Sequence, residues 1–427
     1  MSRKLRNDCF LHDEDRLTHA QALAILRERV SPVVGREEVG LAHATGRYLA
    51  GALTAPRPIP AHTNAAVDGY AFAFAGYDPK AGATLPVKGR VAAGKTAALD
   101  LPKGCAVQIF TGAALPQGLD TVVMQEDTQT GTSGGEPCVR VPAGLSQGVN
   151  RRLEGEDVGR GDELLEAGRR LRPQDVATAA SAGFDRLACF EPLKAAVLSS
   201  GNEIVRAGEP LAPGQVYDAN APMLRGLIEA AGVVCDDLGV LGDERGEVEA
   251  ELERAARAYH VVITTGGASR GEEDHIVEAM ARLGQLHMWQ IAVKPGRPMA
   301  FGRIGDGLVM GLPGNPVAVF VCFLLYVRPV LVRLAGGAWR EPVRYPLPAA
   351  FAVPEKKTGR REFWRGYLTN DAEGGIAVGK FERDGSGLIS SLRAADGLIE
   401  IGEETASVAE GDRVQFIPFS QFGIASA

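Results

Sequence analysis

The chain has 427 residues, more than one ordinary domain holds, and this length predicts two to four domains. Hydrophobic residues make up 45% of it and charged residues 23%, proportions typical of globular domains that bury sizeable cores. The net charge of -7 argues against a nucleic-acid partner, although it leaves room for a local basic pocket. The 53 glycines and 25 prolines indicate many turns and strands rather than a helical bundle.

The cysteines and the apolar segments predict a cytoplasmic protein without a membrane partner. Six cysteines are dispersed with no CxxC pair and no Cys/His cluster, which favours a reducing compartment over a disulfide framework or a zinc site. The charged residues 1–15 lack the apolar core of a signal peptide. The most apolar run, 316–327, has about 12 residues, fewer than the roughly 20 that span a bilayer, and Arg328, Pro329 and Arg333 interrupt it. We expect a buried helix there.

The first part of the chain predicts a helix followed by a β domain. Residues 17–29 have an apolar helical face, and Thr18 and Gln21 have the spacing of a capping box. From 56 to 149, short alternating runs lie between glycines and prolines, a pattern typical of strands. Residues 151–189 are charged and partly helical, and can return beside the first helix. We therefore expect a discontinuous N-terminal module at 1–56 and 150–190, with a β domain inserted at 57–149.

The next segment alternates between apolar runs and helical stretches. The apolar runs are residues 195–198, 233–240, 261–264, 288–293 and 307–310. The helical stretches are 222–231, 245–258, 274–283 and a last one from Pro316. This alternation predicts a doubly wound α/β domain at 191–336. The tail, 337–427, has several short apolar runs and no long helical pattern, which indicates a small β domain.

Residues 89–96, GRVAAGKT, fit the GxxxxGKT phosphate-loop pattern letter for letter. A true phosphate loop follows a buried strand and begins a helix at its lysine. Asp100-Leu101-Pro102 would break such a helix, and the surrounding sequence is typical of a β domain. We interpret the match as accidental.

Two motifs of the predicted β domain place polar side chains on turns. Asp68 precedes Gly69 after a proline-rich approach, which puts a carboxylate on a turn where it can face a ligand. Thr111 follows an apolar run and precedes Gly112. Taken alone, each motif is better explained as an ordinary turn.

Two further motifs follow apolar runs of the predicted α/β domain. Residues 199–203, SSGNE, form a small hydroxyl-rich turn at the carboxyl end of a strand, where open α/β sheets bind ligands, and Glu203 could hold a divalent ion. Residues 263–274, ITTGGASRGEED, form a glycine-rich turn whose backbone N–H groups would suit a phosphate. A glycine-rich turn after a strand, as in the second motif, can occur in any doubly wound protein.

A fifth pattern combines two proline-glycine turns. Residues 293–298, VKPGRP, carry two cations on a rigid turn, which is suited to an oxyanion such as phosphate or molybdate. Residues 311–316, GLPGNP, place Asn315 at the N-cap and Pro316 at the first turn of the apolar helix. Capping and direct ligand contact are both open for Asn315.

In this order the segments resemble the molybdopterin molybdenumtransferase family, whose members include the transferase half of fusion proteins such as gephyrin. Residues 66–71 look like the family's MDGYA motif, 109–126 like its ITGAxxPxGxxxVVMQE stretch and 199–204 like its TGDEL. Residues 263–274 look like SGGVSxGxxD, 294–298 like KPGKP and 312–317 like LPGNPV, while 17–29 resemble the N-terminal helix. Several are weak singly, but seven in register are specific. The resemblance implies an elongated N-terminal module, an inserted β domain, a doubly wound molybdopterin-binding domain and a small β-barrel-like C-terminal domain.

The resemblance also implies a reaction: insertion of molybdate into adenylylated molybdopterin with magnesium, releasing AMP. It implies catalytic roles for Asp68, Glu203, Asp243 and Asp274, the last three around Mg²⁺. Substrate contacts are implied for Thr111, Ser200, Gly201, Gly266, Gly267, Ser269, Lys294, Arg297, Pro313, Gly314, Asn315, Arg361, Ser386 and Ser391. A homodimer with a shared active site is implied, and transient contact with other proteins of the same biosynthesis is a further expectation.

The sequence departs from the family pattern at four positions. Gln290 stands where many relatives carry a second lysine, and Arg297 replaces the lysine of KPGKP. Asn202 and Val67 replace an aspartate and a methionine. Arginine keeps the charge but changes its geometry, whereas Gln290 removes a charge, so the cations that hold the oxyanion are the least secure transfer.

Two other functions stay open. A molybdopterin adenylyltransferase shares the TTGG-type loop, although such enzymes are usually single domains without the β-domain motifs. A non-catalytic pterin carrier or scaffold is the other, and the intact acidic positions argue against it.

Overall fold

The computed structural model describes residues 16–94, 101–266, 275–371 and 373–424. By its internal contacts the chain forms two compact units. The first comprises residues 1–51, 167–171 and 187–427, and the second comprises residues 52–166 and 172–186. The predicted division into four domains stays a prediction.

A six-stranded sheet forms the centre of the first unit, in the order β16-β13-β17-β21-β20-β18. Its parallel strands are β13 (Lys194–Ser200), β16 (Val234–Leu241), β17 (Val261–Thr265) and β21 (Gly307–Leu312). Two antiparallel strands, β20 (Pro298–Ile304) and β18 (Gln285–Gln290), extend it. The carboxyl ends of the four parallel strands therefore lie at one edge of the sheet.

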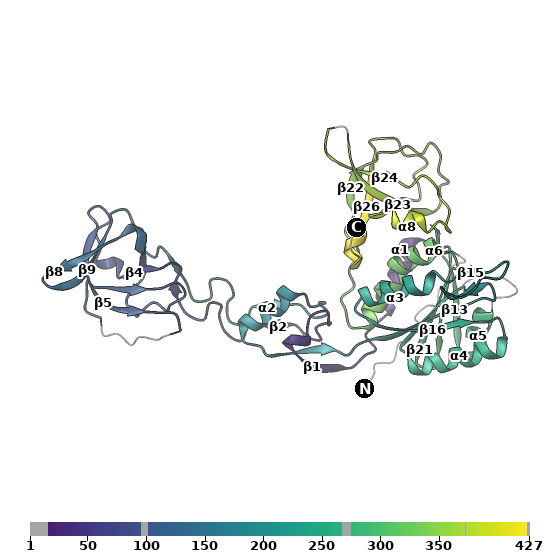
Figure 1. Ribbon diagram of the computed structural model, residues 1–427, viewed down its shortest axis with the longest axis horizontal. Coiled ribbons are helices and arrows are strands. Elements are labelled where there is room, and N and C mark those ends of the chain that lie inside the picture. The colour runs from purple at the N-terminus through teal and green to yellow at the C-terminus, as the bar shows by residue number, and fades with distance from the viewer. Residues whose placement is uncertain (1–15, 95–100, 267–274, 372, 425–427) are drawn as a thin grey trace. The chain divides into compact units, whose positions relative to one another are not determined.

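Helices cover both faces of this sheet (Figure 1). α4 (Arg245–Ala258) and α5 (His275–Leu283) pack with Leu198 and Val262 on one face. α3 (Asn220–Ala230) and the apolar helix from Pro316 pack with Val197 and Ile263 on the other. Because neighbouring residues of a strand point to opposite faces, strands buried on both sides are apolar throughout. The predicted doubly wound domain is thus the observed one.

The apolar helix is longer than its apolar run. It continues through α6 (Pro316–Cys322), a π-helical turn η4 (Phe323–Val327) and α7 (Arg328–Leu334). Arg328 and Pro329, which interrupt the apolar run, lie in the first turn of α7. The 19 residues are long and apolar enough to cross a membrane, but 78% of the most apolar stretch is buried inside the protein. The segment is a core helix, as the sequence predicts.

Strand β20 was not among the predicted runs. It forms hairpins with β18 and β21, and Met299, Ala300 and Phe301 are fully buried within it. The run predicted at 288–293 instead divides between β18 and the short strand β19 (Val293–Lys294). The sequence motif KPGRP therefore lies between β19 and β20.

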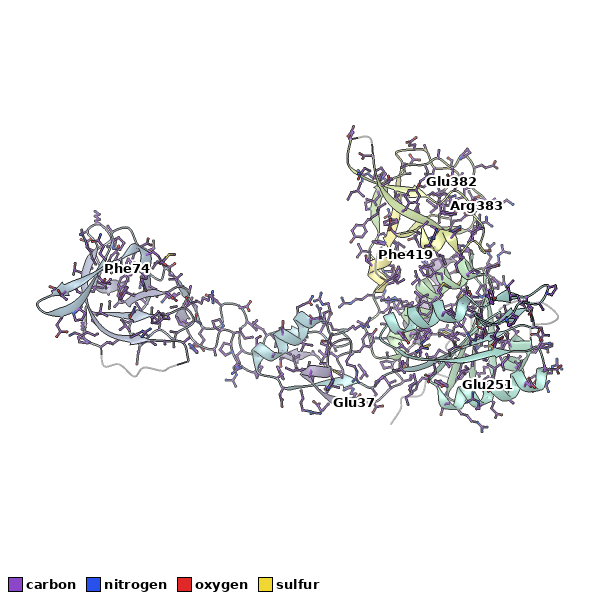
Figure 2. All side chains as sticks on the ribbon, viewed as in Figure 1. Glu37, Phe74, Glu251, Glu382, Arg383 and Phe419 are labelled. Carbon is purple, nitrogen blue, oxygen red and sulfur yellow. The ribbon has the colours of Figure 1, made fainter. Side chains whose placement is uncertain are left out.

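The C-terminal sheet has the order β19-β23-β25-β26-β22, with β24 on β23. Its other strands are β22 (Tyr345–Pro348), β23 (Arg361–Asn370), β24 (Ile376–Lys380), β25 (Gly397–Ile401) and β26 (Arg413–Pro418). β19 pairs with β23 in parallel and aligns Lys294 with Glu362. Phe419 on η5 (Phe419–Phe422), labelled in Figure 2, packs its ring 5.0 Å from that of Phe320. These contacts join the C-terminal sheet to the α/β core.

Helix α1 (His19–Arg29) has the predicted capping box. Thr18 accepts a hydrogen bond from the backbone N–H of Gln21, and the Gln21 side chain accepts one from Thr18. Nearby, β1 (Arg36–Gly40) pairs with β12 (Arg186–Phe190), so the chain returns beside its N-terminal segment after the second unit.

The second unit contains a six-stranded sheet, in the order β7-β4-β6-β5-β9-β8. Its strands are β4 (Gly69–Phe72), β5 (Ala83–Val91), β6 (Ala106–Ile109), β7 (Thr121–Met124), β8 (Gln129–Ser133) and β9 (Glu136–Val141). Tyr70 and Phe72 contribute to one apolar cluster and Ala71 to another, so β4 is buried on both sides. The unit also holds the short pairs β2 (Leu53–Thr54) with β11 (Glu163–Leu165) and β3 (Asn64–Ala65) with β10 (Arg151–Arg152), and helix α2 (Pro173–Ala182).

The accidental phosphate-loop match begins inside strand β5. Gly89, Arg90 and Val91 are strand residues, not a loop after a strand. Lys95 and Thr96 lie outside the described residues.

Candidate active site

The turns that follow the parallel strands meet at one edge of the α/β sheet. Gly266 follows β17, and its backbone N–H donates to the carbonyl oxygen of Leu312 on β21 at 3.2 Å. A Cβ atom on Gly266 would lie 2.9 Å from the carbonyl oxygen of Ser200, and the φ of Gly266 is +95°. Only glycine is compatible with both the close approach and this φ. The predicted residues Ser200, Gly266, Pro313 and Gly314 are therefore brought together.

Two of the three predicted metal ligands, Glu203 and Asp243, lie at this edge. Asp243 Oδ2 accepts from the backbone N–H of Asn202 at 3.0 Å, and Asn202 Oδ1 accepts from the backbone N–H of Asp243 at 3.3 Å. The exposed Glu203 carboxylate lies over Gly201, where a Cβ atom would be 2.5 Å from Glu203 Oε2. Carboxylate oxygens are the ligands that Mg²⁺ takes, so these two residues fit the ion.

The rest of the predicted acidic group is not described. Asp274, Gly267 and Ser269 lie outside the described residues. Within residues 16–94, 101–266, 275–371 and 373–424, no group of three or more His, Cys, Asp or Glu side chains is arranged to hold a metal ion. Glu203 and Asp243 are the predicted metal ligands in the described part of the chain, and this role stays a prediction.

Asp218 and Asn220 support this edge, and the sequence analysis missed both. The buried Asp218 accepts hydrogen bonds from Ser199 Oγ at 2.6 Å and from the backbone N–H groups of Asn220 and Ala221, each at 3.0 Å. Asn220 Nδ2 donates to the carbonyl oxygen of Gly314 at 2.8 Å. The start of α3 thus links the ends of β13 and β21. An aspartate four residues before the helix predicted at 222–231 was the available signal.

A pocket of about 280 Å³ lies between the KPGRP turn, the GLPGNP turn and the C-terminal sheet. The predicted residues in its lining are Lys294, Arg297, Pro313, Asn315 and Ser386. It also contains Trp364, Arg365 and Asp384, which the sequence analysis did not single out. The backbone N–H of Val317 donates to the carbonyl oxygen of Ser386 at 3.0 Å, which holds the two sides together.

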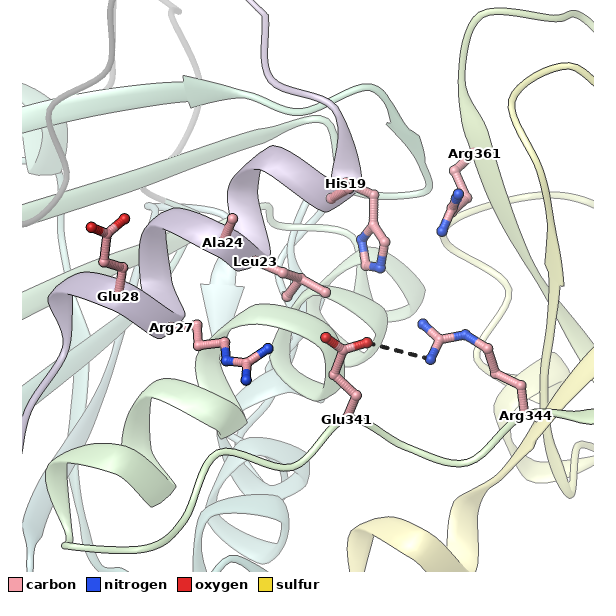
Figure 3. Close-up of a pocket in the computed structure, with 9 residues that line it drawn as sticks. His19, Leu23, Ala24, Arg27, Glu28, Glu341, Arg344 and Arg361 are labelled. Atoms are coloured by element: carbon pink, nitrogen blue, oxygen red, sulfur yellow. Dashed lines mark ion pairs between the residues drawn. The ribbon is translucent and has the colours of Figure 1, made fainter.

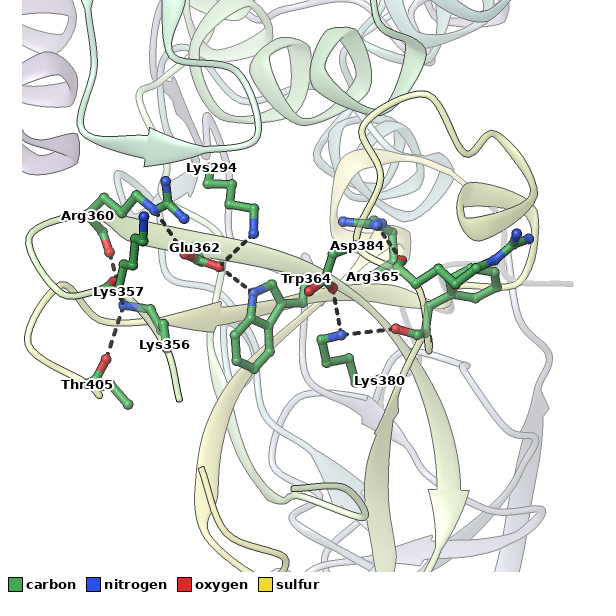
Figure 4. A network of polar contacts seen from close by, with 12 residues as sticks. Lys294, Lys356, Lys357, Arg360, Glu362, Trp364, Arg365, Lys380, Asp384 and Thr405 are labelled. Atoms are coloured by element: carbon green, nitrogen blue, oxygen red, sulfur yellow. Dashed lines mark hydrogen bonds and ion pairs between the residues drawn. The ribbon is translucent and has the colours of Figure 1, made fainter. Parts of the chain in front are cut away.

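The pocket is rich in cations (Figure 4). Lys294 Nζ lies 3.6 Å from Glu362 Oε2, and the same buried carboxylate accepts from Arg360 Nε and Trp364 Nε1, each at 2.9 Å. Burial lowers the pKa of Arg16, and the nearby charges of Arg297 and Arg360 lower it further. The positive charges of Arg297 and Arg360, unlike burial, favour an anion at the same position.

Arg365 is the buried cation of this pocket. Its Nε donates to Ser391 Oγ at 3.1 Å, and its Nη2 donates to the carbonyl oxygen of Arg383 at 3.1 Å. Burial lowers the pKa of Arg365, while Asp384 raises it. Because an arginine stays protonated at neutral pH, this is a fixed positive charge in a poorly solvated position.

Two predicted anion contacts lie away from the pocket lining. Arg361 donates to Glu400 Oε1 at 2.6 Å and to Glu403 Oε2 at 2.8 Å, and it lines a different pocket. Ser391 is fully buried and donates to the carbonyl oxygen of Leu388 at 2.6 Å while it accepts from Arg365. Ser391 therefore positions Arg365.

Asn315 occupies the N-cap of α6, but its side chain makes no capping hydrogen bond. Instead the residue lines the cationic pocket. Pro316 at the first helical position has no N–H that needs a capping acceptor. The Asn315 side chain is thus available to a ligand.

In the second unit, the structure brings Asp68 and Thr111 together. Asp68 Oδ1 accepts from Thr111 Oγ1 at 2.6 Å and from the backbone N–H of Thr111 at 2.8 Å. These hydrogen bonds, the side-chain one first, lower the pKa of Asp68. A Cβ atom on the following Gly69 would lie 1.8 Å from the carbonyl oxygen of Val123, so the pairing of β4 with β7 requires glycine after Asp68.

The fold and the site of the α/β domain identify a class of protein. Residues 196–333 match a family model described as a probable molybdopterin binding domain. Residues 17–183 match the MoeA N-terminal region (domain I and II), and residues 347–419 match the MoeA C-terminal region (domain IV). The α/β domain therefore belongs to the class of molybdopterin-binding domains.

The whole chain is similar to named proteins of one family. It is 35% identical over 405 residues to a molybdopterin molybdenumtransferase of Haemophilus influenzae, covering 95% of this chain and 99% of the relative. It is 31% identical over 409 residues to molybdopterin molybdenumtransferase 2 of Mycobacterium tuberculosis, covering 93% and 97%. A crystal structure of a molybdopterin biosynthesis MoeA protein from Pyrococcus horikoshii matches with a TM-score of 0.77 at 31% identity, covering 95% of this chain and 99% of that one. The chain belongs to the molybdopterin molybdenumtransferase family, enzymes of molybdenum cofactor biosynthesis.

Proposed function

We propose that this enzyme inserts molybdate into adenylylated molybdopterin in a magnesium-dependent reaction that releases AMP. The observation that carries the proposal is the arrangement within the first unit. A cationic pocket with Lys294, Arg297 and Arg365 is lined in part by the GLPGNP turn. The same turn lies at the edge of the sheet that carries Glu203 and Asp243, where the carbonyl oxygen of Gly314 accepts from Asn220 and Gly314 lies close to Gly266. Molybdate and the phosphate groups of the pterin are anions, so such a pocket is suited to them.

In this proposal each group has a distinct role. Glu203 and Asp243, with Asp274, would hold the metal. Magnesium supplies charge neutralisation and polarises the phosphoanhydride towards loss of AMP. Arg365 and Lys294 hold the oxyanion, while the glycine turns at Gly201 and Gly266 let the backbone approach the phosphates. Catalysis is mainly positioning and electrostatics.

The wider setting is also a proposal. We infer a cytoplasmic homodimer in which Asp68 and Thr111 of one subunit complete the site of the other, with transient contact to other proteins of the pathway. The low pKa of Asp68 keeps its carboxylate ionised at neutral pH. An ionised acceptor suits N–H or hydroxyl donors of the substrate.

The experiment compares two substrate pairs with the purified protein. Adenylylated molybdopterin with molybdate and Mg²⁺ is expected to give AMP and molybdenum cofactor. Molybdopterin with ATP is expected to give no adenylylated product. The reverse result would identify an adenylyltransferase, and pterin binding without AMP release in a single turnover would identify a carrier. Chelation of Mg²⁺ with EDTA should stop AMP release, and restored magnesium should recover it.

A further inference from the structure

A second pocket, of about 480 Å³, lies beside helix α1 and is separate from the candidate active site (Figure 3). α1 contributes His19, Leu23 and Arg27, and the opposite wall contains Arg344 and Arg361. None of its lining residues lines the cationic pocket around Lys294. A volume of this size is within the range of small-molecule sites.

His19 is the buried polar residue of this pocket, with 2% of its surface exposed. Its Nδ1 lies 2.8 Å from the hydroxyl oxygen of Tyr326, a fully buried residue. Among the described contacts the Tyr326 hydroxyl has no other acceptor, so it donates to Nδ1. The proton of the neutral imidazole is then on Nε2. That atom is buried without a hydrogen-bond partner, so it is a donor without an acceptor.

Two more donors without partners line a narrower pocket next to the first. This pocket shares His19, Leu23, Glu341 and Arg344 with the larger one, and it also contains Arg328 and Trp339. Arg328 Nε and Trp339 Nε1 are buried without a hydrogen-bond partner. Within the described walls, each unpartnered buried atom is therefore an N–H donor. Because such groups are nearly always paired in native proteins, a ligand that supplies acceptor oxygens is the expected partner.

The shape and charge of the walls narrow the chemistry of this ligand. The narrower pocket has a volume of only about 20 Å³, which is enough for a small polar end group but not for a bulky one. Arg344 forms ion pairs with Glu341 at 3.6 Å and with Glu400 at 2.6 Å. At the His19 ring, the positive charges of Arg361 and Arg344 still outweigh the negative charge of Glu403. The apolar wall residues Leu324 and Leu325 suit a hydrocarbon stem.

We propose that this pocket binds a small organic carboxylate with an apolar stem. The carboxylate accepts hydrogen bonds from His19 Nε2 and Trp339 Nε1, and Arg344 supplies the nearby positive charge. One carboxylate has enough acceptor positions for all of these donors. The stem packs on Leu23 and the apolar walls. The site is independent of the molybdate chemistry, since it shares no residue with that pocket.

The test uses the full chain and 4-phenylbutyrate as the probe, with the uncharged 4-phenylbutanol as the matched control. Titration is followed by calorimetry and by the indole N–H signals of the three tryptophans in nuclear magnetic resonance spectra. The acid is expected to bind saturably and to shift the Trp339 signal while the core residue Trp289 stays unchanged. Trp339→Phe keeps an aromatic ring and removes the donor, and we expect affinity to fall about tenfold. Arg344→Gln should have a similar effect.

A matched variant and two alternative probes keep the outcome clear. Arg257→Gln removes an exposed guanidinium on α4 that pairs with Glu253, and it should leave binding unchanged. Equal affinity for the alcohol would overturn the proposal, as would unchanged binding in Trp339→Phe or no saturable binding. Tighter binding of a peptide with a free C-terminal carboxylate would overturn the small-molecule assignment. A proton found on Nδ1 of His19, instead of Nε2, would overturn its role as donor.

Discussion

Single buried polar residues determine how the turns of this enzyme are held. Asp218 accepts hydrogen bonds from four donors. Three are those of Ser199, Asn220 and Ala221, and the fourth is Arg206 Nη1, which lies 3.3 Å from the oxygen that also accepts from Ser199. Arg206 pairs in addition with Asp237 on β16. Through these contacts the loop that carries Glu203 is tied to the sheet. A carboxylate with all its acceptor positions filled is a positioning residue, not a free ligand.

At this scale His19 predicts a pH dependence of stability. Burial first, and then the charges of Arg361 and Arg344, lower its pKa from 6.5 to about 3. Between pH 6.5 and about 3, His19 binds a proton in the unfolded chain but not in the folded chain. The stability that neutral His19 contributes is therefore fully present above the pKa of the unfolded chain. This stability is lost as the pH falls towards 3. The slope for one group reaches at most about 1.4 kcal/mol per pH unit.

The measurement is urea unfolding at several pH values in that window. His19→Gln keeps an acceptor for Tyr326 but does not titrate, so the pH dependence of its unfolding free energy should be flatter than that of the wild type. Equal slopes for the two proteins would show that His19 titrates normally in the folded state.

Asp68 gives the second prediction for a single residue. Removal of the Thr111 hydroxyl in Thr111→Val takes away the first-named cause of the low pKa, so the pKa of Asp68 should rise towards its ordinary value. The titration of the Asp68 carboxyl carbon, followed by nuclear magnetic resonance, checks this. Thr111→Ser retains the hydroxyl and should titrate as the wild type does. A midpoint that is the same in all three proteins would contradict the assignment.

At the scale of elements, close approach between a turn and a helix shapes the cationic pocket. Gly296 lies in the KPGRP turn at φ +93°, and a Cβ atom on it would be 2.1 Å from Cys322 Sγ on α6. Cys322 Sγ also contacts the Gly296 carbonyl oxygen at 3.4 Å. The turn can therefore rest on the helix only if this residue is glycine.

Gly296→Ala should destabilise the protein by about 2 kcal/mol or more, since overpacking adds to backbone strain. It should also weaken molybdate binding, because the turn carries Lys294 and Arg297. Gly208→Ala is the matched control: its φ is +98° but nothing lies within 4 Å of a Cβ atom there. The control should lose only about 1 kcal/mol and bind molybdate normally. Similar denaturation midpoints for the two variants would exclude the steric explanation.

At the scale of the whole molecule, Asp68 and Glu203 belong to different compact units. The proposed dimer places them in one site from two subunits, and complementation tests this directly. Asp68→Asn and Glu203→Gln should each reduce AMP release by about 100-fold or more while the fold is retained. A mixed dimer of the two variants would then contain one site with both substitutions and one intact site.

Random mixing of equal amounts should restore about a quarter of the wild-type AMP release, because half of the dimers are mixed and one of their two sites is intact. If one subunit supplied both residues, each site of the mixed dimer would carry one substitution. Activity would then stay at the level of the single variants. Mixing wild type with either variant gives the reference for exchange of subunits.

The sequence alone determined the features that depend on local pattern. Apolar runs and helical periodicity predicted the doubly wound domain, and α4 begins and ends at the predicted residues 245 and 258. The Thr18–Gln21 spacing predicted the capping box of α1. Seven short motifs in register predicted the family, because their spacing along the chain is itself the signal.

Tertiary structure decided which of these residues meet. Arg361 was predicted at the anion site but forms ion pairs with Glu400 and Glu403, whereas the unpredicted Arg365 lines the pocket. Both are arginines on β23, and nothing local separates them. Pairing of β23 with β19 and β25, which are distant in the sequence, sets where each side chain points. Local pattern fixes which elements form, but long-range pairing fixes which cation faces the pocket.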